Sequence, residues 1–226
     1  MTVLHLADDG EAADLAAFLS RLLRYDRSAA VRLQAAGTAL AVFGRPPSFE
    51  VLAIRAVRLA KPYEDGLDVT LDVTVSAGEL LESVDEQAAT ATVPKAVTGP
   101  PWAGVLPPRG GWRAEPGLPA PRALRATVTA AVGEFRARTE ELAPEGRTRA
   151  ELDRIGRDIW SRTVGGTRLP VRAVHAAQSL GFLRPGDEPG DEAVLLSAGA
   201  WLRLRTPFGS IAVRRAGLGA LDVSVR

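Results

Sequence analysis

Cysteine is absent from this chain of 226 residues. The absence excludes disulfide bonds, thiolate nucleophiles, and zinc or iron–sulfur sites that depend on cysteine ligands. Because secreted domains commonly carry disulfides, it also favours a cytoplasmic location. Hydrophobic residues make up 46% of the chain and charged residues 24%, which is ordinary for a globular protein that folds without such cross-links.

Lysine and histidine occur only twice each. Neither Lys61 nor Lys95 has the glycine-rich context of a phosphate-binding loop. Neither His5 nor His175 has a second metal ligand three or four residues away, so we expect both to be structural or surface residues. The chain also lacks a dinucleotide-binding fingerprint and a G-x-S-x-G nucleophile motif. We therefore predict no cofactor and no metal, and we assign no catalytic residue.

Long apolar runs and a strong charge of one sign are also missing. No segment approaches the roughly eighteen apolar residues of a membrane span, and the N-terminus lacks the pattern of a signal peptide. The 28 basic and 27 acidic residues leave a formal net charge of +1. Such a balance creates no general attraction to nucleic acid or to an anionic membrane, and we predict no membrane partner.

The most informative pattern that is present is an internal repeat. Residues 30–35 match residues 193–198 at four of six positions, and Gly37 then matches Gly199. With short gaps, the alignment continues to residues 67–70 against 221–224. Such a duplication indicates two similar units related by a pseudo-twofold axis. We expect residues 30–75 to superpose on residues 193–226, with Arg45 on Arg205 and Arg55 on Arg214.

Hydrophobic periodicity assigns elements to each copy. A helix is predicted over residues 10–25, followed by strands near 31–33, 40–43, 49–59 and 67–75. Capping patterns predict helices that begin after Ser76 and Thr148, and spacing predicts further helices over 121–142 and 169–181. The predicted fold class is α+β. It consists of an internally duplicated helix-plus-antiparallel-meander unit, giving two pseudo-symmetric lobes, with additional helices between the copies. Whether the two meanders join in one sheet or face each other stays open.

Composition divides the chain into three parts. Residues 1–92 form a first α+β lobe, residues 93–121 form an ordered linker rich in proline, glycine and tryptophan, and residues 122–226 carry helices and a second α+β lobe. The alternative that these parts share one compact domain stays open. Proline in the linker disfavours helix and strand ladder there. Because exposed indoles are uncommon, Trp102 and Trp112 are expected to hold the linker against both lobes.

The functional hypothesis that we prefer is a non-enzymatic binding or interaction protein. Its partner would be another protein or a second copy of the chain, or a small ligand would lie in a groove between the lobes. The candidate binding surface combines the repeated arginines with the linker tryptophans: Arg45, Arg55, Arg203, Arg205, Arg214, Trp102 and Trp112.

A local resemblance supports an alternative. Helices over 148–162 and 169–181, followed by a hairpin with its tip at 206–209, resemble a winged helix-turn-helix. The resemblance implies a DNA-binding regulator that uses basic residues of this region: Arg168, Arg172, Arg203, Arg205, Arg214 and Arg215. The repeat argues against it, because a similar hairpin occurs in the first copy without two preceding helices. A third alternative is an enzyme with its site between the lobes.

Overall fold

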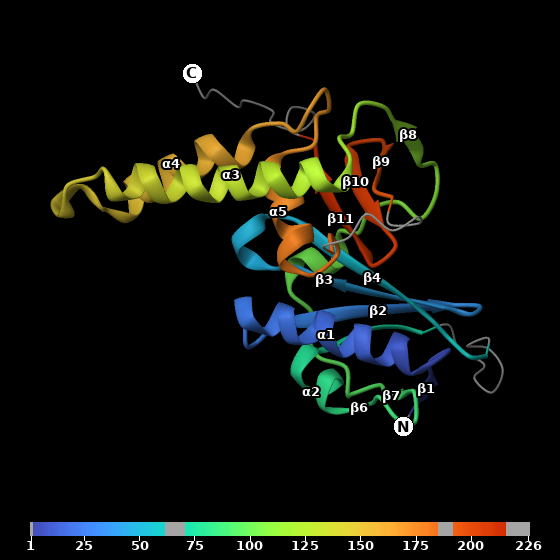
Figure 1. The fold of residues 1–226 in the computed structure, drawn as a ribbon. Coiled ribbons are helices and arrows are strands. Elements are labelled where there is room, and N and C mark those ends of the chain that lie inside the picture. The colour runs from blue at the N-terminus through green and yellow to red at the C-terminus, as the bar shows by residue number, and fades with distance from the viewer. Residues whose placement is uncertain (1, 62–70, 185–191, 216–226) are drawn as a thin grey trace, which may run out of the picture.

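The protein is described here from a computed structural model that covers residues 2–61, 71–184 and 192–215. Its main feature is one eight-stranded sheet in the order β5-β2-β3-β4-β11-β10-β9-β8, with every neighbouring pair antiparallel. The two meanders therefore join edge to edge in a single sheet (Figure 1). The strands are β2 (Ala30–Ala36), β3 (Ala39–Gly44), β4 (Leu52–Arg58), β5 (Asp72–Ser76), β8 (Arg113–Glu115), β9 (Val194–Ala198), β10 (Trp201–Thr206) and β11 (Gly209–Arg214).

The internal duplication is visible in the strand register. Strands β2 and β3 are joined by a turn at Gly37, and strands β9 and β10 by a turn at Gly199. Both glycines have positive φ angles, of 55° and 53°, which a two-residue hairpin turn requires and which glycine adopts without steric cost. Between the halves, Ile54 of β4 lies directly opposite Ser210 of β11.

The positions of the repeated arginines differ from the sequence alignment. Counting along the ladders from the two glycine turns, the first-copy equivalent of Arg205 is Phe43, and the equivalent of Arg214 is Arg58. The predicted pairs of Arg45 with Arg205 and of Arg55 with Arg214 are therefore wrong.

The cause is the unequal length of one connection. Strand β3 continues to β4 through residues 45–51, whereas β10 turns into β11 through Pro207 and Phe208 alone. The sequence alignment placed its gaps elsewhere, and a shift of one residue moves a side chain to the other face of a strand. By the same count Ile54 and Ser210 are equivalent positions, so the pseudo-twofold axis passes between them. The aligned segments 67–70 and 221–224 lie outside the described residues.

Helices cover one face of the sheet, and their starts follow the predicted capping patterns. The side chain of Ser76 accepts a hydrogen bond from the amide of Glu79, and Thr148 accepts one from Glu151. The long helix begins at Pro121, as expected from proline's fixed φ angle. The helices are α1 (Asp9–Tyr25), α2 (Ala77–Glu82), α3 (Pro121–Glu140), α4 (Arg149–Ser161) and α5 (Val171–Ser179), with 3-10 turns η1 (Pro47–Phe49), η2 (Pro101–Gly104) and η3 (Pro144–Gly146).

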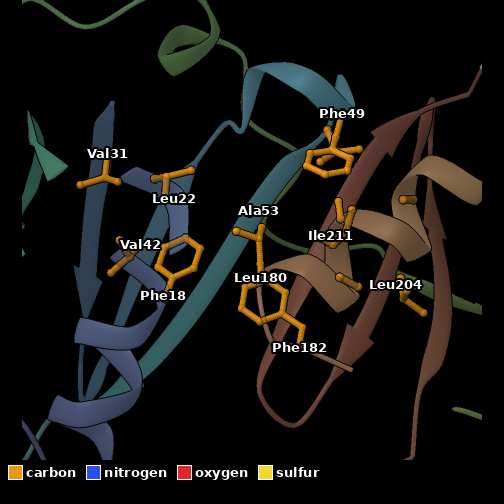
Figure 2. Packing of buried hydrophobic residues seen from close by; sticks show 14 of the residues in the cluster. Phe18, Leu22, Val31, Val42, Phe49, Ala53, Leu180, Phe182, Leu204 and Ile211 are labelled. Atoms are coloured by element: carbon orange, nitrogen blue, oxygen red, sulfur yellow. The ribbon is translucent and has the colours of Figure 1, made fainter. Parts of the chain in front are cut away.

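The hydrophobic core is continuous across the junction of the two halves. Helix α1 packs on β4 and α5 packs on β11, so each copy places its helix on the same face of the sheet. Figure 2 shows Phe18 of α1 and Phe182 after α5 close to Ala53 at the junction. The two phenyl rings are stacked with their centroids 5.7 Å apart. Because both halves contribute to this one core, the halves are lobes of a single folding unit.

A second layer of helices lies outside the first. Helix α3 packs against α4 and α5, and the pair α3 and α4 extends beyond the sheet (Figure 1). Within the described residues, none of the helices combines the length and the apolar character that crossing a membrane requires.

Several short strands were not predicted from the sequence. Strands β1 (Val3–His5), β6 (Val84–Asp85) and β7 (Thr90–Thr92) form a small three-stranded sheet near the N-terminus. Strand β8 lies inside the linker, where proline led us to expect no strand ladder, and pairs with β9 at the sheet edge. None of these strands has more than three residues, which is too short for a periodic pattern to appear in the sequence.

One histidine is partly buried against aromatic rings. His175 of α5 lies between the indole of Trp160, 4.8 Å away between centroids, and the ring of Phe49, 5.0 Å away. Burial lowers the pKa of His175 below its usual value near 6.5, because the charged imidazolium would lose its hydration.

This burial predicts a pH dependence of stability. The unfolded chain takes up a proton at His175 more readily than the folded chain, so the free energy of unfolding should fall as the pH decreases below about 6.5. Urea denaturation at a series of pH values between about 7.5 and 5 would measure the slope. His175→Gln should flatten it, whereas His5→Gln, which changes an exposed histidine, should leave it as in the unmodified chain. An unchanged slope in the His175 variant would contradict the prediction.

Candidate functional site

The face of the sheet opposite the helices carries a second, smaller apolar cluster. Side chains of β3, β4 and β11 meet there at the junction of the two halves, where the linker covers them. The buried members are Phe43, Leu52, Ile54 and Ala212, and Trp102, Leu106 and Trp201 pack against them.

The linker crosses this face from one edge of the sheet to the other. It begins beside β5, where the carbonyl of Thr74 accepts a hydrogen bond from the amide of Val97. It reaches the central cluster at Trp102, and it continues to β8 at the opposite edge. On the way, Trp112 lies below the guanidinium of Arg203, 5.7 Å from the ring centroid. Both linker tryptophans thus hold the linker against the sheet, as the sequence predicted.

A pocket of about 370 Å³ opens between the linker and the sheet at this junction. Its size is in the lower part of the range for small-molecule sites. Most of its wall is apolar, and two indole rings contribute to it. The lining residues are Arg45, Glu50, Val51, Leu52, Pro101, Trp102, Val105, Trp201, Ala212, Val213 and Arg214.

The pocket arises where the two copies differ. Its first-copy wall is the connection between β3 and β4, in which η1 precedes Glu50, a residue with a left-handed backbone (φ 51°). The second copy has only a two-residue turn at the equivalent position. The linker supplies the remaining wall through η2 and Val105, which is 46% exposed at the rim. The pocket is therefore a property of the whole chain and not of either repeat.

Two arginines stand at the pocket without an acidic partner. Both Arg45 and Arg214 are exposed, and no ion pair within the described residues involves either guanidinium. Arg214 lies over the indole of Trp201, 5.3 Å from its centroid. Glu50 is the one carboxylate of the lining, and the lining contains no imidazole or hydroxyl group. The described residues also contain no cluster of three side chains that could hold a metal ion.

Two more arginines lie on β10 near the pocket, and neither is one of its lining residues. Arg203 and Arg205 are two positions apart, so their side chains leave the same face of the strand. Arg203 is directly opposite Ala212, which lines the pocket. Burial, with a smaller contribution from the charge of Arg205, lowers the pKa of Arg203, and its Nε is buried without a hydrogen-bond partner. A positive charge is thus partly removed from water here without a counter-ion.

Arg55 does not belong to this surface. Its side chain is 6% exposed and lies on the helix side of the sheet, where it forms ion pairs with Glu11 at 2.9 Å and Asp14 at 3.3 Å. It also donates a hydrogen bond to the carbonyl of Phe208, at the tip of the second copy's hairpin. The sequence hypothesis that Arg55 contributes to a binding surface is corrected accordingly: the side chain links α1 to the second copy.

The remaining candidates from the sequence gather on the other face. Arg45, Arg214 and Trp102 line the pocket, and Arg203, Arg205 and Trp112 lie on the adjoining part of the sheet. Trp201, Glu50 and Val105 were not among the candidates. Trp201, Arg203 and Arg205 are spaced two residues apart, so they share one face of the strand. This spacing could have identified Trp201 from the sequence.

The packing of the helices differs from what the winged-helix resemblance implies. Helix α5, the expected recognition helix, packs against α3, α4, η1 and β11. Five of its residues are buried: Val171, Ala173, Val174, Ala176 and Ala177. The other four residues of α5 are only partly exposed, which leaves little surface with which to enter a DNA groove.

The buried position of Arg55 predicts a large effect on stability. Arg55→Leu should lower the free energy of unfolding by about 1.5–3 kcal/mol, because it removes charge-assisted hydrogen bonds to Glu11 and Asp14. Glu11 keeps Arg58 as a partner and Asp14 keeps Arg184, so neither carboxylate is left alone. Arg149→Leu, which removes a helix-surface ion pair with Asp153, is the control and should change stability far less. Chemical denaturation measures both. Equal effects of the two substitutions would show that the Arg55 network is not structural.

Comparison with known families finds two adjacent domains, with the boundary between them inside the linker. Residues 1–104 match the family described as "Domain of unknown function (DUF8010)". Residues 107–218 match the family described as "Domain of unknown function (DUF8185)". No curated protein matches the chain. Two adjacent domains of similar length fit the two-lobe α+β arrangement of the structure.

Proposed function

We propose that this protein is a binding protein without catalytic activity, and that the pocket at the junction of the two halves holds a small ligand with an apolar, planar body. The observation that carries the proposal is the pocket itself. Its floor is formed by both halves, through Leu52 and Ala212, and two indoles contribute to its wall. Indoles offer large, rigid contact area to planar groups.

The chemistry of the lining favours binding over catalysis. A hydrolytic or proton-transfer site commonly needs a nucleophile or a base beside a second polar group. The lining supplies Glu50 as its single carboxylate, and this side chain is exposed to solvent. Its other polar groups are guanidiniums, which bind anions but do not exchange protons near neutral pH.

A small ligand fits better than docking of a second chain. Docking surfaces are extended apolar patches, whereas Trp102, Trp112 and Trp201 are all partly covered by neighbouring residues. The concave apolar surface on this side of the sheet is the pocket, with Val105 exposed at its rim. A cytoplasmic location for the ligand and the protein is supported by the lack of cysteine.

The proposal is tested with N-phenyl-1-naphthylamine, a neutral probe whose fluorescence rises in apolar sites. The probe should bind with one-to-one stoichiometry and quench part of the tryptophan emission. Val105→Asp should weaken its affinity about fivefold to tenfold, because an ionised carboxylate at the rim disfavours an apolar body there.

A matched control is available in the same linker. Val97 is 40% exposed, compared with 46% for Val105, and does not line the pocket. Val97→Asp should therefore leave the probe affinity unchanged. Absence of stoichiometric binding, or equal loss in the two variants, would refute the proposed site.

A further inference from the structure

We propose, resting on the function above, that the ligand is an amphipathic anion whose single oxyanion group, carboxylate, sulfonate or phosphate, is bound by Arg203 and Arg205 beside the pocket. The apolar body would occupy the pocket, and the charged group would lie over β10. Arg45 and Arg214 would contribute favourable charge at the pocket. The proposal assigns to the β10 arginines a role that the fold does not otherwise explain.

The first argument is the cost of the isolated charge. Arg203 is half-buried, its guanidinium lies against Trp112, and no carboxylate of the described residues pairs with it. Partial burial of an unpaired cation is unfavourable, and a second cation at Arg205 adds repulsion. A bound oxyanion would offset both effects through charge-assisted hydrogen bonds.

The second argument is a contrast within the same sheet. Arg32 of β2 is also half-buried, and it is fully satisfied: Nε and Nη2 donate to Asp72 on the neighbouring strand. Arg215 also has a carboxylate partner: its Nη2 forms an ion pair with Glu115 at 3.2 Å, while its Nε has no hydrogen-bond partner. The chain thus supplies carboxylates to partly buried arginines elsewhere on the sheet but not to Arg203. The missing counter-charge is what a ligand would provide.

The third argument is position. Arg203 and Ala212 are directly opposite in the β10–β11 ladder, and such neighbours have Cβ atoms about 5 Å apart. An apolar body on Ala212 and Leu52 would therefore carry its anionic group within reach of the guanidinium. Trp112 would limit the space above Arg203 and orient its planar group.

The size of the site favours a small anion over a nucleic acid strand. A strand needs an extended groove with successive phosphate contacts. Here the linker crosses the sheet on both sides of the pocket, and the accessible volume is about 370 Å³. The formal net charge of +1 also gives no long-range attraction to a polyanion.

The test compares two probes that differ only in one sulfonate. The anionic probe is 8-anilinonaphthalene-1-sulfonate, and its neutral counterpart is N-phenyl-1-naphthylamine. The unmodified chain should bind the anionic probe roughly tenfold more tightly, and this preference should weaken as salt is added. Arg203→Gln should remove the preference and leave the affinity for the neutral probe unchanged.

Three further variants separate a binding role from a structural one. Arg205→Gln, at an exposed position, should reduce the preference even if Arg203→Gln fails to fold. Arg203→Lys should restore part of it, because the charge is kept and the planar fork is lost. Arg136→Gln, an exposed change on α3, should have no effect. Thermal unfolding checks that each variant folds.

The outcomes distinguish the two proposals. If the neutral probe binds in the pocket but the sulfonate gives no preference, or if Arg203→Gln and Arg205→Gln leave the preference intact, the anion site is refuted and the binding pocket stands. If the neutral probe fails to bind, the proposed function itself fails. If a single-stranded oligonucleotide displaces the anionic probe in a length-dependent way, the small-anion proposal is overturned in favour of nucleic acid.

Discussion

The ladder between β4 and β11 is the interaction on which the rest of the structure depends. It joins two antiparallel meanders into one sheet, with Ile54 opposite its own equivalent, Ser210. This ladder pairs one edge strand of each meander and brings the helices of the two copies side by side. The helices therefore share one core, in which Phe18 stacks on Phe182. Arg55 reinforces the same junction from the helix side, through Glu11 on α1 and the carbonyl of Phe208 in the other copy. Separating the copies would expose a strand edge and divide this core, so neither half is expected to be stable alone.

Departures from the twofold symmetry create the candidate site. A symmetric dimer-like sheet would present two equivalent, shallow surfaces on its uncovered face. Here the connection between β3 and β4 is long and its counterpart is a tight turn. The linker crosses the sheet once, and the pocket forms where it passes the junction, with Arg214 from the second copy and Arg45 from the first. Duplicated units commonly specialise in this way, because one copy can change its loops while the shared sheet retains the fold.

The sequence predicted local structure better than it predicted the site. Capping residues such as Ser76 and Thr148, and turn glycines such as Gly37 and Gly199, act through contacts within a few residues, and the structure confirms them. The α+β fold class and the duplication were also correct. Register was not predictable, because the alignment of the repeats tolerates a shift that moves a side chain to the opposite face of a strand. Arg55 illustrates the consequence: it was expected at a surface and is buried against Glu11 and Asp14. The pocket depends on three segments that are distant in the chain, and no local pattern encodes their meeting.

Buried Arg55 and half-buried Arg203, on opposite faces of the sheet, show how structural and functional charges can be distinguished. Arg55 has two carboxylates and a carbonyl around it, so its burial is explained by the fold alone. Arg203 has an indole and a second arginine beside it and no carboxylate partner, so its position adds a cost that folding does not recover. A sequence free to optimise stability would place a carboxylate or an apolar residue there. Because that cost falls beside the pocket at the junction of the two halves, a ligand that supplies the missing negative charge would explain it.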